Sequence, residues 1–357
     1  MIVLAFDSFK GCISASEACQ TASEAIKELI PDAEVIECPL SDGGEGLVDC
    51  IRKILPVKVM SVKAHGPLAF ADGEGSDIID ACYVLSEDGK TAYMEMAATS
   101  GLPLVPIAKR NPMLTTTYGV GDMIVDAARR GVSHIIMGIG GSATCDGGKG
   151  MIKAIQDSGV KFQDLPRITV ACDVTNTLYG EKGAAYVFAP QKGATAEQVV
   201  ALDRQLRAFA QETEEAGLAT PELAEFAGAG AAGGLGYGLM AYLGAELKSG
   251  IDIMLDIADF DQLIKNADLV ITGEGKSDAQ TLMGKLPEGV LKRCRKQNVP
   301  VWLLSGCIDD EYSTLADNFD LVKSINEEDN RSLEVLMQPS VAKQNLKNTL
   351  YLILHRK

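Results

Sequence analysis

The sequence is short of the residues that a zinc site or a disulfide framework needs. Its nine cysteines include no C-x-x-C pair and their number is odd, and its three histidines are widely separated. Structural zinc sites and disulfide-rich folds depend on closely spaced Cys and His residues. We therefore predict reduced thiols and a cytoplasmic location, without a zinc centre.

Positive charge is also scarce. The 357 residues include 33 Lys and Arg against 49 Asp and Glu, which gives a formal net charge of −16 at pH 7. A surface of this sign repels nucleic acid and anionic membranes, so we expect neither as a partner. A small phosphate or carboxylate ligand must then find a local group of cations or arrive with a metal ion.

Segments typical of export or membrane insertion are missing too. The N-terminal run MIVLAFDSF has no basic residues before it and contains an acid, so it predicts a buried strand and not a signal peptide. Residues 226–245 carry no charge but include seven glycines, and Glu225 and Glu246 flank them where basic anchors would be expected. A closely packed, Gly-rich loop and helix is the better interpretation.

Both ends of the chain show strand patterns alternating with helix patterns. The first helix is predicted after Ser14, which forms a capping box with Glu17. Strands alternating with helices predict the α/β class, with a parallel, doubly wound sheet. Five short apolar runs are the predicted strands of that sheet, at residues 2–7, 34–40, 267–273, 299–306 and 320–325.

The middle of the chain has a different pattern. Three extended runs at 57–66, 76–89 and 90–97 predict an antiparallel meander, which a purely parallel sheet would not contain. A helical pattern around Val120 to Ala128 and a buried strand at 134–140 follow. We predict a mixed α/β domain inserted into the first domain. The predicted bounds are 1–59 plus 256–357 for the first, discontinuous domain and 60–255 for the inserted one.

Two Gly-rich turns resemble nucleotide-binding motifs without matching them fully. Gly275-Lys276-Ser277 has the ending of a Walker A motif, but Val270 stands where its first glycine belongs. Gly138, Gly140 and Ala143 fit a weak dinucleotide fingerprint, which Cys-Asp-Gly-Gly interrupts where a helix should open. The second turn still leaves backbone N–H groups that can face an anion.

Charged and polar residues follow three of the predicted strands. Ligands of open parallel sheets bind at the carboxyl ends of the strands, so these side chains are expected to share one edge. Carboxylates that bind Mg²⁺ or accept a proton, beside lysines that neutralise phosphoryl oxygens, suit phosphoryl transfer. The residues concerned are Asp7, Ser8, Lys10, Asp42, Glu45, Glu274, Lys276 and Asp278.

Several longer stretches together resemble the type I glycerate kinase family along nearly the whole chain. They include DSFKG, PLSDGGEG, RNPMLTTTYGVG, GIGGSATCDGGKGM, GAGAAGGLGYGL and ITGEGKSDAQTLMGKLPEGV. The resemblance implies a flavodoxin-like domain interrupted by a restriction-endonuclease-like domain. It implies ATP-dependent phosphorylation of D-glycerate, with 2-phosphoglycerate as the expected product. The chain departs from the family pattern at Lys276, Cys145 and Thr177, where arginine, asparagine and proline are common.

The resemblance and the residues together suggest roles in a cleft between the two domains. Lys10 and Lys285, with Lys276, are expected to bind the substrate carboxylate or the transferring phosphoryl group. Asp42 or Asp146 is expected to accept the hydroxyl proton. Carboxylates expected near Mg²⁺ are Asp42, Glu274 and Asp278. Ser8 and the glycine turns complete the predicted phosphate-binding set, through Gly43, Gly44, Gly140, Gly141, Ser142 and Gly147.

Two other interpretations stay open at the level of the sequence. A hydroxyacid oxidoreductase with a nucleotide cofactor would use the turn from Gly138 to Ala143. A non-catalytic small-molecule binder would carry the same acids as solvated loops. The residue pattern leaves the oligomeric state open.

Overall fold

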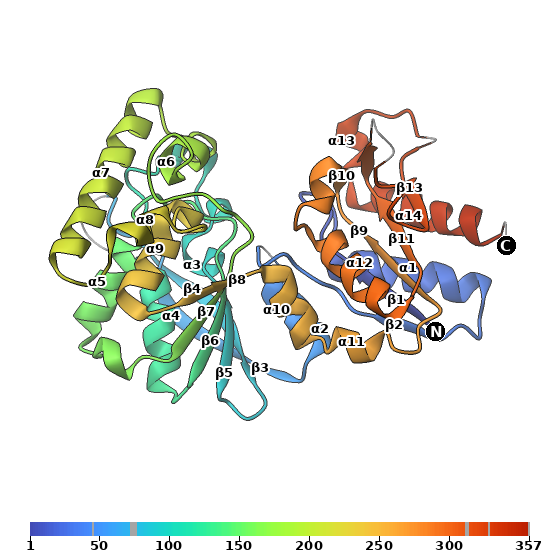
Figure 1. The fold of residues 1–357 in the computed structure, drawn as a ribbon, viewed down its shortest axis with the longest axis horizontal. Helices are drawn as coiled ribbons and strands as arrows, with labels where there is room; N and C mark the ends of the chain where they lie inside the picture. Colours follow the sequence, from blue (N-terminus) through green and yellow to red (C-terminus); the bar gives the residue numbers. More distant parts are fainter. Residues whose placement is uncertain (45, 72–76, 311–313, 328, 356–357) are drawn as a thin grey trace. The chain divides into compact units, whose positions relative to one another are not determined.

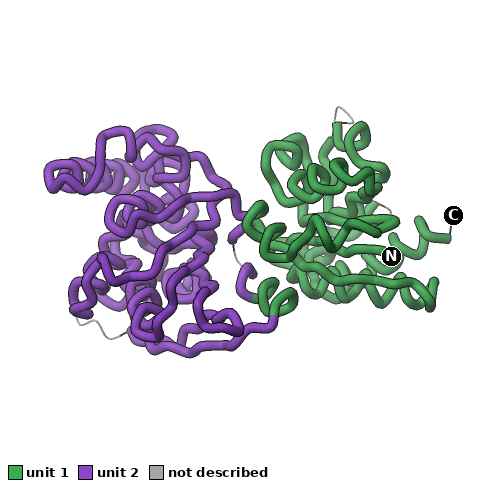
Figure 2. Tube along the Cα trace, turned by 60° about the horizontal axis from the view of Figure 1, so that its bottom comes forward, with its two compact units in different colours: residues 1–42, 49–55, 251–357 green, residues 43–48, 56–250 purple. Residues whose placement is uncertain are grey.

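Two α/β units make up the chain in a computed structural model, which describes residues 1–44, 46–71, 77–310, 314–327 and 329–355 (Figure 1). Unit 1 comprises Met1–Asp42, Asp49–Leu55 and Ile251–Lys357, and unit 2 comprises Gly43–Val48 and Pro56–Gly250 (Figure 2). Each unit has its own sheet and its own apolar core. All nine cysteines are free thiols.

The sheet of unit 1 is parallel throughout, as the sequence pattern predicted. Its strand order is β13-β11-β9-β1-β2, so successive strands are added on one side of β1 and then on the other. This order reverses direction between β1 and β9. The strands span Ile2–Phe6 (β1), Val35–Glu37 (β2), Leu269–Gly273 (β9), Val301–Ser305 (β11) and Leu321–Ser324 (β13).

Helices cover both faces of this sheet, which is why its central strands are apolar on every side. Helices α1 and α14 pack on one face, and α12 contacts β9 and β11 (Figure 1). The predicted capping box of Ser14 and Glu17 is present at the start of α1. The helices are α1 (Ala15–Leu29), α2 (Leu47–Ile54), α10 (Gly250–Ile257), α11 (Phe260–Leu263), α12 (Leu286–Gln297), α13 (Leu333–Leu336) and α14 (Pro339–Leu354).

The sheet of unit 2 is mixed. Strands β3, β4 and β5 form the predicted antiparallel meander, and β5 to β8 are parallel. The sheet order is β3-β4-β5-β6-β7-β8. The strands span Val57–His65, Ile78–Ser86, Thr91–Glu95, His134–Gly138, Arg167–Ala171 and Glu246–Lys248.

The Gly-rich stretch 226–245 forms the tightly packed loop and helix that its composition predicted. A Cβ on Gly233 would lie 2.0 Å from the Thr144 carbonyl oxygen, so only glycine fits there. None of the helices in the described part of the chain combines the length and apolar composition that a membrane span needs. The helices of unit 2 are α3 (Ala97–Ser100), α4 (Tyr118–Arg129), α5 (Lys149–Ser158), α6 (Ala184–Phe188), α7 (Ala196–Glu215), α8 (Pro221–Glu225) and α9 (Ala231–Leu243).

Short helical turns connect several of these elements. They span Leu102–Leu104, Ile107–Lys109, Phe162–Asp164 and Pro190–Lys192 in unit 2, and Ala279–Leu282 in unit 1. A two-stranded parallel sheet in unit 1 pairs β10 (Lys276–Asp278) with β12 (Cys307–Asp309). The turn at Ala279–Leu282 and strand β10 follow β9 directly and carry much of the candidate site.

Gly121 allows α4 and α5 to cross at close range. A Cβ at this position would lie 2.5 Å from the Met151 carbonyl oxygen and 2.6 Å from Ala154 Cβ. Alanine usually stabilises a helix by up to ~1 kcal/mol relative to glycine. Here we expect Gly121→Ala to lower the free energy of unfolding by about 1–3 kcal/mol, because the helices must separate. Urea unfolding measures this free energy, and Arg204→Ala, at an exposed position of α7, is the control. An unchanged unfolding midpoint for Gly121→Ala would contradict the prediction.

Candidate active site

The candidate site in unit 1 lies where the strand order of the sheet reverses. Asp7 directly follows β1 and Glu274 directly follows β9, and the Asp7 N–H donates to the Gly273 carbonyl at 2.9 Å. Loops leaving two such neighbouring strands run to opposite faces of the sheet, which opens a crevice at the strand ends. The two carboxylates therefore start from the position where doubly wound sheets bind ligands.

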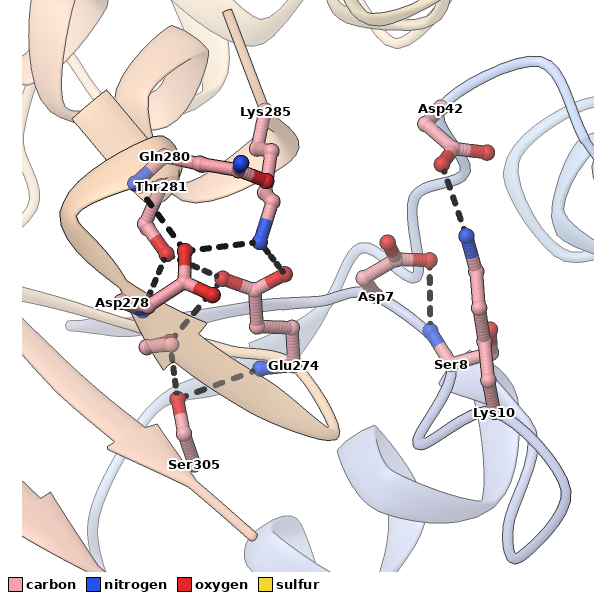
Figure 3. A network of polar contacts seen from close by, with 11 residues as sticks. Asp7, Ser8, Lys10, Asp42, Glu274, Asp278, Gln280, Thr281, Lys285 and Ser305 are labelled. Carbon is pink, nitrogen blue, oxygen red and sulfur yellow. Dashed lines mark hydrogen bonds and ion pairs between the residues drawn. The ribbon is translucent and has the colours of Figure 1, made fainter. Parts of the chain in front are cut away.

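Glu274 is held by hydroxyl groups in an almost buried position. Its side chain accepts hydrogen bonds from Ser277 Oγ at 2.9 Å and Thr281 Oγ1 at 2.7 Å (Figure 3). Ser277 Oγ also lies 2.7 Å from Ser305 Oγ at the end of β11. A buried carboxylate needs such donors, because water no longer solvates it. The network fixes the direction of the Glu274 carboxylate.

Lys285 connects Glu274 with a second carboxylate. Its Nζ lies 3.8 Å from Glu274 Oε2 and 3.3 Å from Asp278 Oδ1. Asp278 also accepts a hydrogen bond from the Gln280 N–H at 3.0 Å, which caps the turn that follows it. Lys285 itself stands directly before α12. One ammonium group thus faces two carboxylates, and all three belong to unit 1.

Asp7 is a buried acid with an unusual pKa. Burial, and to a smaller extent the negative charge of Asp42, raises the pKa of Asp7 to about 7, although Lys10 and the Ser8 N–H act in the opposite direction. That N–H donates to Asp7 Oδ1 at 2.6 Å. Asp7 therefore exchanges its proton close to neutral pH. In Figure 3 it lies between the pair Lys10–Asp42 and the network of Glu274.

Lys10 and Asp42 form an ion pair near Asp7. Lys10 Nζ lies 3.2 Å from Asp42 Oδ2, and the Lys10 side chain is mostly exposed. The negative charge of Asp42 raises the pKa of Lys10 above its ordinary value. An exposed ion pair contributes little to stability, so the Lys10 ammonium group can exchange this contact for one with a ligand at small cost.

Two other predicted residues of unit 1 have local roles in the structure. Lys276 makes an exposed ion pair with Asp309, 2.8 Å away, across the sheet of β10 and β12. The Asp309 carboxylate raises the pKa of Lys276. Ser8 acts through its backbone N–H on Asp7. Glu45, which the sequence placed at the same edge, lies outside the described residues.

The glycine turns predicted to bind phosphate belong to unit 2. A Cβ on Gly43 would lie 2.6 Å from Ala171 Cβ, and one on Gly140 would lie 2.5 Å from Gly44 Cα. The pair Gly43-Gly44 therefore packs directly on the turn that follows β6. The helix α5 begins only at Lys149, so this turn does not open into a helix as a dinucleotide-binding turn does.

Asp146 and Gly147 shape this turn from within. Asp146 Oδ2 accepts hydrogen bonds from the Thr117 N–H at 2.9 Å, Thr117 Oγ1 at 2.8 Å and the Gly150 N–H at 3.1 Å. Its Oδ1 accepts from the Gly148 N–H at 3.1 Å. The Gly147 N–H donates to the Gly233 carbonyl at 3.0 Å. Both residues thus direct their polar groups into the protein.

Several residues of the site were not predicted. Ser277, Thr281 and Ser305 surround Glu274, and Lys192 lies buried beneath the turn after β6. In the sequence, Thr281 follows Glu274 by seven residues and gives a weak local signal. Ser305 comes from another strand, and the burial of Lys192 depends on packing, so neither had a recognisable pattern.

The carboxylates of the unit 1 site suit a magnesium ion that binds together with the phosphates of a nucleotide. Among the residues that the structure describes, no three His, Cys, Asp or Glu side chains gather closely enough to hold a metal ion by themselves. Mg²⁺ commonly keeps several waters and binds one or two carboxylates together with substrate phosphates. Asp42, Glu274 and Asp278 remain the predicted protein ligands for a Mg²⁺ of that kind.

The pKa of Asp7 predicts a pH-dependent stability. Its folded value of about 7 exceeds its ordinary value of 3.8, so the stability from this proton is present below pH 3.8 and is lost as pH rises through about 7. Relative to the wild type, Asp7→Asn should therefore gain on the order of 3 kcal/mol of stability between pH 4.5 and pH 8. Urea unfolding at pH 4.5 and pH 8 measures this difference. An equal effect of the substitution at both pH values would show that Asp7 titrates normally.

Comparison with known proteins relates the whole chain to one family. The profile described as the Glycerate kinase family matches residues 2–166 and 161–356. The chain is 44% identical over 340 residues to a glycerate kinase of Halalkalibacterium halodurans, with 88% of this chain and 87% of that protein covered. It is 40% identical over 343 residues to the glycerate 2-kinase of Escherichia coli, again with 88% and 87% covered.

A solved structure agrees with the sequence relatives. The crystal structure of a protein named glycerate kinase 2 from Salmonella typhimurium LT2 matches with a TM-score of 0.77 and 37% identity, and covers 99% of both chains. The α/β fold with its parallel and mixed sheets is thus shared with that protein. From the extent and identity of these matches, the chain belongs to the glycerate kinase family.

Proposed function

We propose that this chain is a glycerate kinase, which transfers the terminal phosphoryl group of ATP to a hydroxyl group of D-glycerate. The expected product is 2-phosphoglycerate, as the name of the Escherichia coli relative suggests. In this reaction the hydroxyl oxygen forms a bond to the γ-phosphorus. The bond from phosphorus to the bridging oxygen breaks, ADP leaves, and the hydroxyl proton passes to a base.

The observation that carries the proposal is the mixture of charges at the strand reversal of unit 1. Lys10 and Lys285 stand there among four acids, and both lysines are partly exposed. Phosphoryl transfer needs cations for the oxygens of the transferred group and carboxylates for Mg²⁺ and the proton. A bound Mg²⁺ would neutralise charge on the phosphates. The acids concerned are Asp7, Asp42, Glu274 and Asp278.

We assign the general base to Asp42 in preference to Asp146. Asp42 belongs to the partly exposed pair with Lys10. Asp146 uses both carboxylate oxygens for four hydrogen bonds at the start of α5. A base must reach the proton that it removes, which disfavours a carboxylate held by four hydrogen bonds within the protein. Glu274, whose carboxylate is fixed by Ser277 and Thr281, suits the role of a Mg²⁺ ligand.

The glycine turn of unit 2 provides backbone N–H groups for an anionic part of a substrate. We place Gly140, Gly141 and Ser142 in this role, because their turn follows β6 and contains the left-handed Gly141, with φ of +72°. No observation favours the hydroxyacid oxidoreductase that the same turn suggested in the sequence.

An ADP-release assay tests the function directly. Purified protein with MgATP should release ADP only when D-glycerate is added, and ³¹P NMR should locate the phosphate on carbon 2 of the product. Removal of Mg²⁺ with a chelator should stop the release. Oxidation of NADH by a ketoacid without any need for ATP would reject the kinase proposal.

Substitution of Asp42 tests the assignment of the base. We expect Asp42→Asn to lower kcat by ~100- to 10,000-fold, the usual contribution of general-base catalysis, with a much smaller change in KM. Steady-state kinetics measure this, and Asp32→Asn in an exposed turn is the matched control. Asp146→Asn should mainly lower the free energy of unfolding. Full turnover in Asp42→Asn, with a large loss of kcat in a stable Asp146→Asn, would reverse the assignment.

A further inference from the structure

Lys192 is a buried ammonium group for which the proposed reaction has no role. Its side chain is only 3% exposed, and Nζ donates to Ser142 Oγ at 2.6 Å and to the Thr144 carbonyl at 2.7 Å. Both partners are neutral, and no ion pair of Lys192 occurs within the described ranges of the chain. A buried charge without a counter-charge is costly, so the position of Lys192 beneath the glycine turn needs an explanation.

The turn above Lys192 has donors that are left without acceptors. Gly140, Gly141 and Ser142 donate no backbone hydrogen bond to any residue that the structure describes. Gly141 is exposed and has a φ of +72°, which lets successive N–H groups point the same way. Such concave groups of N–H donors bind anions.

The hydroxyl group of Ser142 adds one more donor to this set. An ammonium group has no lone pair, so Ser142 Oγ must accept the bond from Lys192 and keeps its own O–H to donate. Among the described residues no acceptor for that O–H is found. The turn therefore combines the buried positive charge of Lys192 with N–H and O–H donors that have no acceptor among the described residues.

We propose that Lys192 is a positioning residue that makes the turn of Gly140, Gly141 and Ser142 a binding site for a substrate oxyanion. Its charge acts through Ser142, and the oxyanion is a phosphate group of the nucleotide or the carboxylate of the hydroxyacid. The choice of these two ligands rests on the proposed kinase function. The oxyanion supplies the missing counter-charge, and the turn supplies the hydrogen bonds.

The chemistry around Lys192 agrees with this role. Burial lowers the pKa of Lys192 to about 8, while Cys145 and Asp146, the titratable groups that face it, act in the opposite direction. Burial raises the pKa of the Cys145 thiol to about 11, so this neighbour stays neutral near pH 8. The main chain of Arg110 packs on Gly193, the residue after Lys192, and the Arg110 Nε is buried without a hydrogen-bond partner among the described residues.

Isothermal titration of the full chain with ADP and, separately, with D-glycerate tests the proposal. We expect Lys192→Met to raise the Kd of one of the two ligands by about 10- to 100-fold. A change of this size is typical for the loss of a hydrogen bond to a charged group. Weaker ADP binding identifies a phosphate in the turn, and weaker D-glycerate binding identifies the carboxylate. Lys182→Met, at an exposed lysine of the same segment, is the matched control and should bind both ligands like the wild type.

A pH series separates a charge from a merely structural side chain. Wild-type affinity for the affected ligand should fall about tenfold between pH 7 and pH 9, as Lys192 loses its proton, whereas Lys192→Met should show no such change. Ser142→Ala is the second variant in case Lys192→Met does not fold, and at least a threefold loss of affinity is expected.

Three results would overturn the proposal. Wild-type protein that binds neither ligand, folded variants at Lys192 and Ser142 with unchanged Kd for both, or a wild-type affinity that is flat with pH would each overturn it. These binding data do not require turnover. Loss of affinity in Lys192→Met, in a protein that releases no ADP with D-glycerate, would uphold the oxyanion site and reject the kinase proposal.

Discussion

The reversal of strand order between β1 and β9 is the constraint on which the site of unit 1 depends. In a parallel sheet every strand ends at the same edge, but only at a reversal do neighbouring loops leave in opposite directions. Asp7 and Glu274 occupy these two strand ends, hydrogen-bonded through the main chain of Asp7 and Gly273. Gly273 itself admits no side chain, since a Cβ would lie 1.7 Å from the Leu304 carbonyl oxygen. Close strand packing thus places the acids side by side.

The electrostatics of the site depend on how strongly each acid is solvated. Glu274 is buried but receives two hydroxyl donors and faces Lys285, so its charge is compensated locally. Asp7 is buried with one backbone donor, and burial together with Asp42 raises its pKa to about 7. The net charge of −16 would repel anions, and the lysines at positions 10 and 285 offset it where a phosphate would bind. Local placement of cations therefore matters more than overall charge.

Glycine has a different use in unit 2, where it allows main chains to touch. Gly140 contacts Gly44, and Gly233 contacts the Thr144 carbonyl, at distances that exclude a Cβ. This packing fixes the turn after β6, while the N–H groups of residues 140–142 have no backbone acceptor among the residues that the structure describes. The same arrangement places the Lys192 ammonium group beneath them, where its hydrogen bonds go to neutral groups.

The fold could be predicted to a large extent from local patterns, because periodicity and capping act over a few residues. The five parallel strands, the capping box of Ser14 and Glu17 and the antiparallel meander followed from hydrophobic spacing. The association of Lys10 with Asp42 also followed from the positions of both residues just after strands. The Gly-rich motifs of the chain indicated the family that the comparisons then showed.

Tertiary structure decided the features that depend on burial and on contacts between distant segments. Ser305 contacts Ser277 from another strand. The Asp146 carboxylate accepts hydrogen bonds from Thr117 and from the N–H of Gly150 at the start of α5. Lys192 and Lys182 look alike in the sequence, yet one is enclosed by the protein and the other faces solvent. The sequence by itself determined the strands, the helices and the types of group at their ends. Which of these groups are desolvated, and hence which pKa values change and which donors stay unpaired, was decided only when remote segments packed around them.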